Sequence, residues 1–468
     1  MPPETDEILL NEAFEELIAS GDQAALKEFL NDQNISDVAD LIYEYEDKDT
    51  EIISLLAIHR AAGVFKILDL SEQKRIINNL PASKSAELLN ELPPDDRVDF
   101  FEELPTFTVR ELIKTLNPEE RKITLELLGY PENSVGRLMT PDYVYVYEYN
   151  TVAEVLDTIR RWGTNSETID VIYVINGKGE LIDDIRIRDF ILALPDAKVS
   201  DLMDERFTSL KVNDDQEIAS DVFKMSNRNA LPVTDVNNIL LGIVTIDDVL
   251  WVAQEEFTED MQKMGGTEAL DEPYLDTPFF KLMQKRAGWL IVLFFGELLT
   301  ATALAYFNDE IAKATVLVMF MPLIASSGGN SGSQASTLII QAMAVGEVTI
   351  ADWWRVMRRE IFSGLVLGGI LGLIGFIRIT LWHELMTKGI FKDLYGPHWF
   401  LIAVTVGISL IGVVLWGTIT GSMLPLLLKK LGADPAVSSA PFVATLVDVT
   451  GLIIYFSVAY FFLQGILL

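Results

Sequence analysis

Residues 399–428 read WFLIAVTVGISLIGVVLWGTITGSMLPLLL, a run of thirty residues without a charged side chain. A helix needs about 20 predominantly apolar residues to cross the hydrocarbon core of a bilayer. Working outward from this run, we find four more stretches of sufficient length. The five predicted spans are residues 289–307, 315–345, 361–381, 399–428 and 437–463. The C-terminal part of the chain is therefore predicted to be a helical membrane domain.

Charge divides the chain near residue 280. Residues 1–280 carry 59 Asp and Glu against 24 Lys and Arg, whereas residues 281–468 carry 10 against 12. The absence of cysteine excludes thiolate catalysis, disulfides and cysteine-ligated metal sites. A net charge of −33 predicts no nucleic-acid partner. The first part is predicted to be a soluble anionic body that senses or helps to move cations.

Basic side chains predict the orientation in the membrane. If the spans alternate, eight fall on one side: Lys281, Lys285, Arg286, Arg355, Arg358, Arg359, Lys429 and Lys430. The positive-inside rule then places the N-terminus in the cytoplasm and, with an odd number of spans, the C-terminus outside. The first residues, MPPETDEILLNEAFEEL, lack a basic region followed by an apolar one, so no signal peptide is predicted.

Two features inside the predicted spans are expensive in lipid. Residues 326–334 read SSGGNSGSQ, and Asn330 and Gln334 exceed what close packing of small residues requires. This stretch favours backbone that unwinds beside a polar passage over simple helix packing. Asp448 lies in the last span, where a carboxylate costs on the order of 2.5–3.5 kcal/mol. A cation pathway is the preferred interpretation, and a protonated Asp448 bonded to a neighbouring helix is the alternative.

The N-terminal part contains a twelve-residue repeat. Leucine recurs at positions 68, 80, 92, 104, 116 and 128, and proline follows closely at positions 81, 93, 105 and 118. Because proline interrupts helices and short helices bury a face only by stacking, residues 1–133 are predicted to form an α-helical superhelix.

A second repeat follows. Residues 135–140, VGRLMT, are echoed by residues 199–204, VSDLMD, and β-rich runs follow each copy at 171–175 with 181–187 and at 230–234 with 240–245. The pattern resembles a tandem pair of cystathionine β-synthase (CBS) domains, residues 134–196 and 197–252. The resemblance implies a nucleotide site at Tyr173, Arg188 and Asp189. Asp184 and Arg186 replace the Gly and Ser/Thr that are usual in the first copy.

An acidic segment, residues 253–284, joins these domains to the first span. Phe257, Met261 and Met264 can share one face of a helix there while acids occupy another. The segment is predicted to be a connecting (plug) helix.

In its whole length the chain resembles the MgtE family of magnesium channels. The most specific motifs are GGNSGSQ at 328–334, Asp434-Pro435-Ala436 and LVDVTG at 446–451. The resemblance implies a homodimer in the bacterial inner membrane with a pore domain of five spans, residues 285–468. It implies a Mg²⁺-selective channel for magnesium uptake that intracellular Mg²⁺ closes, with ATP as a further modulator.

The resemblance also assigns residues. In the pore, Asp448 holds Mg²⁺ with help from Asn330 and Gln334. The acids implied to bind regulatory Mg²⁺ are Asp95, Glu217, Asp248, Glu256, Glu259, Asp260 and Asp434. Asn227 and Trp251 stand where the resemblance implies acids, so at least one regulatory site is expected to be weaker or absent.

Two other functions fit the same residues. One is a membrane-anchored sensor of divalent cations or nucleotides, and the other is a coupled secondary transporter of divalent cations. An enzyme is not predicted, because no catalytic domain accompanies the CBS pair. The sequence alone leaves selectivity among Mg²⁺, Co²⁺, Ni²⁺ and Mn²⁺ open.

Overall fold

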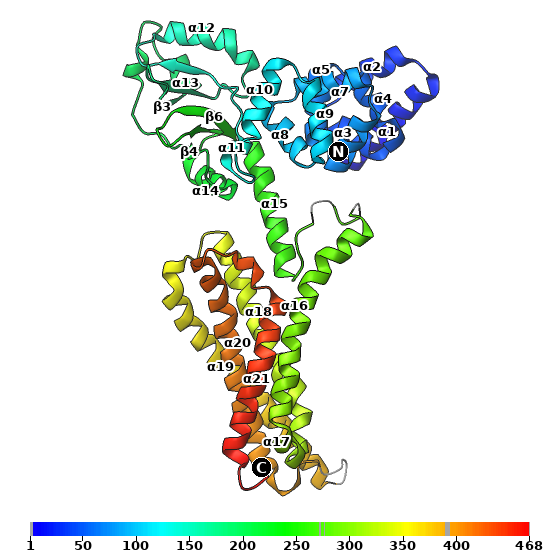
Figure 1. Cartoon of the computed structure of the whole chain (residues 1–468), viewed down its shortest axis with the longest axis vertical. Coiled ribbons are helices and arrows are strands. Elements are labelled where there is room, and N and C mark those ends of the chain that lie inside the picture. Colours follow the sequence, from blue (N-terminus) through cyan, green and yellow to red (C-terminus); the bar gives the residue numbers. More distant parts are fainter. Residues whose placement is uncertain (1–2, 271–272, 276, 389–393, 468) are drawn as a thin grey trace. The chain divides into compact units, whose positions relative to one another are not determined.

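The computed structural model describes residues 3–270, 273–275, 277–388 and 394–467. The chain forms two compact units, Met1–Glu256 and Phe257–Leu468 (Figure 1). Leu468, the end that the sequence analysis places outside, lies beyond the described residues.

The first unit begins with a stack of short helices. They are α1 (Pro3–Ser20), α2 (Gln23–Asp32), α3 (Ile35–Glu44), η1 (Glu46–Lys48), α4 (Asp49–Leu55), α5 (Ile58–Ile67), α6 (Leu70–Asn79), α7 (Ala82–Glu91), α8 (Pro94–Glu102), α9 (Thr106–Thr115) and α10 (Pro118–Leu127). Leucine of the repeat forms the C-cap of α5, α6, α7, α9 and α10. Its members Leu68, Leu80, Leu92 and Leu116 are buried in one continuous core. The predicted superhelix is confirmed.

Two small mixed sheets complete the first unit. Their strands are β1 (Tyr145–Tyr147), β2 (Val171–Ile175), β3 (Leu181–Arg186), β4 (Leu210–Lys211), β5 (Ala230–Thr234) and β6 (Leu240–Thr245). In each sheet the first strand pairs parallel with the second, which pairs antiparallel with the third. This repeated order confirms the predicted CBS pair and its β-runs.

Further helices follow along the chain, and the last of them continues past Glu256, the end of the first unit. They are α11 (Val135–Leu138), α12 (Val152–Trp162), η2 (Gly163–Asn165), α13 (Ile187–Leu192), η3 (Val199–Asp201), α14 (Gln216–Ser226) and α15 (Ile246–Met264). Helix α15 starts directly after β6, within the second predicted CBS domain, and ends before the predicted plug segment does. The next helix begins only at Phe279.

The second unit contains long helices. They are α16 (Phe279–Tyr306), α17 (Asn308–Lys313), η4 (Thr315–Phe320), α18 (Met321–Ala344), η5 (Ile350–Asp352), α19 (Trp353–Thr387), η6 (Gly396–His398), α20 (Trp399–Lys430), η7 (Pro435–Val437) and α21 (Ala440–Leu463). Among the described residues, four helices are long and apolar enough to span a membrane: α16, α19, α20 and α21, the second and third with their preceding 3₁₀ turns. Helix α18 has 24 residues, but its polar stretch lowers its hydropathy. Five spans therefore remain a prediction.

The polar stretch of α18 does not unwind. Residues 326–334 stay helical, so the favoured sequence interpretation is wrong for the backbone. The glycines instead let helices approach closely: Gly328 lies against Val413 and Val447, and Gly332 lies against the backbone of Gly417. Backbone hydrogen bonds kept within a helix cost less in lipid than an opened turn. Small residues thus pack one face of α18, and the side-chain amides of Asn330 and Gln334 lie exposed on another face.

Gly421→Ala tests this packing. A Cβ at Gly421 would overlap the carbonyl oxygen of Gly332, so α18 and α20 must separate. We expect about 1–3 kcal/mol of destabilisation, seen as a lower melting temperature of the full chain in detergent.

Gly369→Ala is the matched control, because a Cβ at Gly369 on α19 meets no atom within 4 Å. It should keep or slightly raise the melting temperature through the better helix propensity of alanine. Equal melting temperatures for both variants would contradict the packing argument.

Candidate functional site

Two of the predicted regulatory acids come together in the first unit. Asp95 lies in the first turn of α8 and is 6% exposed, and its Oδ1 has no hydrogen-bond partner among the residues that the structure describes. Asp248 lies in the first turn of α15, where its Oδ2 accepts a 2.6 Å hydrogen bond from Thr245. Burial, and then the charge of Asp248, raise the pKa of Asp95 well above its ordinary value. Burial is also the main cause that raises the pKa of Asp248 to about 7.

Further charged side chains around this pair were not singled out from the sequence. The additional acids are Asp96, Asp99, Glu167, Asp247 and Glu255. Burial and the neighbouring Glu255 raise the pKa of Asp99 to about 6. The Nζ of Lys66 lies 3.3 Å from Asp96 and 4.0 Å from Asp247. Burial alone would lower the pKa of Lys66, but the carboxylates, led by Asp96, raise it above its ordinary value.

The adjacent pairs Asp95-Asp96 and Asp247-Asp248 were a usable signal for part of this cluster, since each pair opens a helix. No signal pointed to Lys66, which belongs to another helix, α5. The cluster therefore has one ammonium group inside a surplus of half-buried carboxylates. Such a surplus attracts a divalent cation and resists compaction without one.

Two more predicted acids lie near each other on α14 and α15. The Nε2 of Gln216 donates a 3.0 Å hydrogen bond to Oε1 of Glu256. Glu217 is the next residue on α14 and is exposed. The structure thus brings the start of α14 to the part of α15 that carries Glu256.

In the second unit, a lysine lies between two predicted Mg²⁺ ligands. The Nζ of Lys263 donates to Oδ2 of Asp434 at 2.7 Å and also forms an ion pair with Glu259, one turn earlier on α15. Oδ1 of Asp434 accepts from the backbone N–H of Ala436 at 2.8 Å and so caps η7. Burial opposes the charge of Lys263, but the two carboxylates raise its pKa above the ordinary value. Asp260 is half-buried on the same helix.

The predicted pore residues lie on α18 and α21. Asn330 and Gln334 are exposed one turn apart on α18, and Nδ2 of Asn330 lies 3.3 Å from Oγ of Ser326. Asp448 on α21 lies against the neighbouring glycine: a Cβ at Gly329 would be 3.6 Å from its Oδ1. Asp448 forms no salt bridge within the described ranges. A carboxylate and a row of polar side chains therefore share one region of the helix pair.

Hydrogen bonds hold this pair in register. Oγ of Ser333 donates to the carbonyl of Ala440 at 3.0 Å, and Oγ of Ser336 donates to that of Ser438 at 2.8 Å. The start of α21 is thus fixed to α18. Glu297 on α16 also acts electrostatically on Asp448.

The predicted nucleotide residues do not form one surface. Tyr173 is fully buried, and its hydroxyl has no hydrogen-bond partner in the described part of the chain, whereas Arg188 and Asp189 are exposed on α13. Asp184, the unusual residue of β3, forms a bidentate pair with Arg228 at 2.8 and 2.9 Å. Contact of a ligand with Tyr173 would require the core between the sheets to open.

Asn227 and Trp251, the two residues that depart from the family pattern, lie at the end of α14 and on α15. Asn227 ends α14 with φ of 51°, a left-handed conformation that asparagine tolerates. Trp251 is 60% exposed on α15. In the part of the chain that the structure describes, no three His, Asp or Glu side chains converge tightly enough to hold one metal ion directly.

Family patterns match most of the chain. The pattern of MgtE, a divalent cation transporter, matches residues 321–458, that of the MgtE intracellular N domain matches 33–133, and that of the CBS domain matches 135–196 and 199–255. The magnesium transporter MgtE of Thermus thermophilus is 38% identical over 351 residues, 75% of each chain. That of Enterococcus faecalis is 31% identical over 74% of this chain and 73% of its own.

Two solved structures are each similar to about half of the chain. The soluble part of a magnesium transporter has a TM-score of 0.51 and 26% identity, and it covers 53% of this chain and 99% of its own. The cytosolic domain of the Mg²⁺ channel MgtE in complex with ATP has a TM-score of 0.49 and 34% identity, over 51% and 98%.

The acid cluster predicts a pH dependence of local stability. The folded pKa of Asp248, about 7, exceeds the ordinary value of 3.8, so the folded state holds a proton that the unfolded state releases. Stability must then fall as pH rises from about 4 to about 7 and level off above. In buffer without divalent ions, amides of α8 should be at least about threefold less protected at pH 8 than at pH 5.5.

Hydrogen exchange on the full chain, corrected for the intrinsic rate at each pH, measures this difference. Asp248→Asn should reduce it, whereas Asp196→Asn, at an exposed loop position, should not. Greater protection of wild-type α8 at pH 8 would contradict the prediction.

Proposed function

The chain belongs to the MgtE family of divalent cation transporters, and from that premise we propose that it is a Mg²⁺-selective channel for magnesium uptake. The observation that carries the proposal is the position of Asp448, beside the polar face of α18 and without a salt bridge in the described residues. A carboxylate kept unpaired among membrane helices is expensive, and a passing cation compensates for that cost.

The pore is proposed to form in a homodimer, with Asp448 contributed by each copy near a two-fold axis. Magnesium loses its water reluctantly and prefers one or two carboxylates with several waters retained. Two Asp448 carboxylates would attract the hydrated ion, and Asn330 and Gln334 would hydrogen-bond to its waters. Because no closed cage of direct ligands forms, the ion is released as readily as it enters.

Regulation is proposed to reside in the acidic groups of each unit. In the first unit the carboxylate of Asp95 on α8 and that of Asp248 on α15 repel each other. Two carboxylates about 6 Å apart repel by about 3 kcal/mol at an effective dielectric of about 20. Bound Mg²⁺ reverses the sign of this term and favours the compact arrangement, so rising intracellular Mg²⁺ closes the channel. Glu217 and Glu256 are proposed to form a second such group.

Several weak sites give a steep response. Moving a two-state equilibrium from 1:99 to 99:1 requires about 5.5 kcal/mol of differential binding. Sites that each contribute about 1–2 kcal/mol reach this sum only together, so closure is cooperative. In the second unit Glu259, Asp260 and Asp434 are the proposed ligands between α15 and η7, in competition with Lys263.

ATP is proposed as a modulator that binds the CBS pair. The support is chemical: Arg188 and Asp189 are exposed on α13, where they can contact phosphate and ribose. The chain is proposed to lie in the bacterial inner membrane with the first unit in the cytoplasm, in keeping with the positive-inside bias.

Asp448→Asn tests the pore. Removing the charge while keeping the shape should lower Mg²⁺ flux into proteoliposomes by at least about tenfold, because the ion loses its compensating carboxylates. Asp309→Asn removes an exposed carboxylate on α17 and should leave the flux unchanged. Wild-type flux in Asp448→Asn would contradict the pore, and flux that requires a sodium or proton gradient would indicate a coupled transporter.

Lys263→Gln tests the regulatory site of the second unit. Without the competing ammonium, Glu259 and Asp434 should bind Mg²⁺ more tightly. The internal Mg²⁺ concentration that half-closes the channel in patch-clamp recordings should fall by about two- to fivefold. Lys224→Gln is the control, because Lys224 pairs with Asp221 on its own helix. An unchanged or higher half-closing concentration would show that Lys263 does not compete with the metal.

A further inference from the structure

An amphipathic groove lies on the first turns of α19. It encloses about 620 Å³ and is lined by Trp354, Arg355, Arg358, Arg359, Ile361, Phe362 and Leu365. Three of these seven side chains are guanidinium groups and the others are apolar or aromatic. Its lining therefore changes from cationic to apolar along the helix axis.

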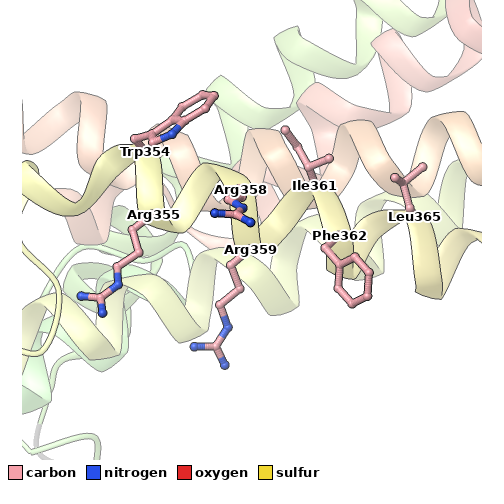
Figure 2. A pocket seen from close by; sticks show the side chains of 7 residues that line it. All are labelled: Trp354, Arg355, Arg358, Arg359, Ile361, Phe362 and Leu365. Carbon is pink, nitrogen blue, oxygen red and sulfur yellow. The ribbon is translucent and has the colours of Figure 1, made fainter.

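Helical spacing produces two adjacent rows. Figure 2 shows Arg355, Arg359 and Phe362 projecting from the same side of α19, as positions four and three residues apart must. Trp354 and Leu365 project from the other side. Each row begins with a residue type that is common at a membrane interface, tryptophan or arginine, and ends with an apolar side chain, Leu365 or Phe362.

Acids balance the arginines of the groove only in part, because Asp352 lies near Arg355 and Glu360 acts electrostatically on Arg359. Arg358 and Arg359 form no salt bridge in the part of the chain that the structure describes, and Arg355 lies 3.8 Å from Asp352 with its side chain 88% exposed. Arginine binds phosphate by two parallel hydrogen bonds, and its guanidinium is weakly hydrated. The groove thus presents guanidinium donors for a phosphate diester, and among the described residues no carboxylate forms a salt bridge with Arg358.

The exposed apolar side chains beside the arginines indicate that the ligand also has an apolar part. Phe362 is 70% exposed and Leu365 is 46% exposed, and both follow the arginines toward the apolar span. The opposite face of α19 is already occupied, because Gly364, Gly368 and Gly372 pack against α20. The face of α19 that carries the arginines points away from α20 and can therefore contact lipid.

We propose that this groove binds an anionic phospholipid, whose phosphate lies on Arg355, Arg358 and Arg359 and whose acyl chains lie on Phe362 and Leu365. A free phosphate would satisfy the guanidinium groups but not the exposed apolar side chains. The site is independent of the proposed pore and regulatory acids, since none of its residues belongs to either.

Native mass spectrometry of the full chain, released from detergent with phosphatidylglycerol or phosphatidylcholine, tests the proposal. Wild type should retain phosphatidylglycerol in preference to phosphatidylcholine. Arg358→Gln with Arg359→Gln should weaken phosphatidylglycerol retention by at least about tenfold. The matched control, Lys429→Gln with Lys430→Gln, removes two exposed charges at the end of α20 and should change retention by less than about twofold.

Three outcomes would overturn the proposal. Equal losses in the two double variants would assign the effect to general surface charge, and equal retention of the two lipids would remove the headgroup preference. Complete displacement by millimolar inorganic phosphate would assign the groove to a free anion. If the glutamine variant does not fold, Arg358→Lys with Arg359→Lys keeps the charge. It should show a reduced but still selective retention, and loss of the lipid preference in it would equally count against the proposal.

Discussion

The membrane unit depends on contact between glycine backbones. Gly332 and Gly421 bring α18 and α20 so close that neither position has room for a side chain, and Gly328 admits Val413 and Val447 into the same seam. Because small residues occupy the packed face, the large polar residues of the same stretch are confined to the other faces. Close packing and polar exposure are thus two consequences of one pattern. Asp448 lies beside Gly329 of this stretch, and a Cβ at Gly329 would be 3.6 Å from its Oδ1, an ordinary contact distance.

In the first unit the corresponding constraint is electrostatic. Asp95 is almost completely buried beside other acids, and one of its oxygens accepts no hydrogen bond from any described residue. An unpaired buried carboxylate is tolerated in the neutral form or beside a cation. Lys66 supplies a single positive charge to this group. The fold therefore stores repulsion at the contact between the helical superhelix and the CBS pair, where protons or a divalent ion relieve it.

Much of the fold followed from local pattern. The repeat of leucine and proline predicted a stack of short helices, and the β-rich runs predicted the four longer strands almost to the residue. The site was harder, because its decisive contacts join distant residues: Lys263 and Asp434 are 171 positions apart. The burial of Tyr173 was also invisible, since it depends on how the two sheets pack. The unwinding expected at 326–334 failed because glycine-rich sequence permits both an opened turn and tight helix packing. The partner helix decides between them.

The ion pairs of Lys263 with Glu259 and Asp434 affect the Mg²⁺ concentration at which this group of acids can bind the metal. An ammonium group held by Glu259 and Asp434 already provides half the charge of Mg²⁺, and it is tethered, so its local concentration does not vary. A divalent ion must displace the ammonium group. Its net binding free energy is then only the difference between its own attraction to the two carboxylates and that of the ammonium group. Exchange of one cation for another therefore responds at a higher metal concentration than filling of an empty acidic site. Under the proposed function, Lys66 and Lys263 would set the Mg²⁺ level at which closure begins, while the surplus of acids sets how strongly the closed arrangement is favoured.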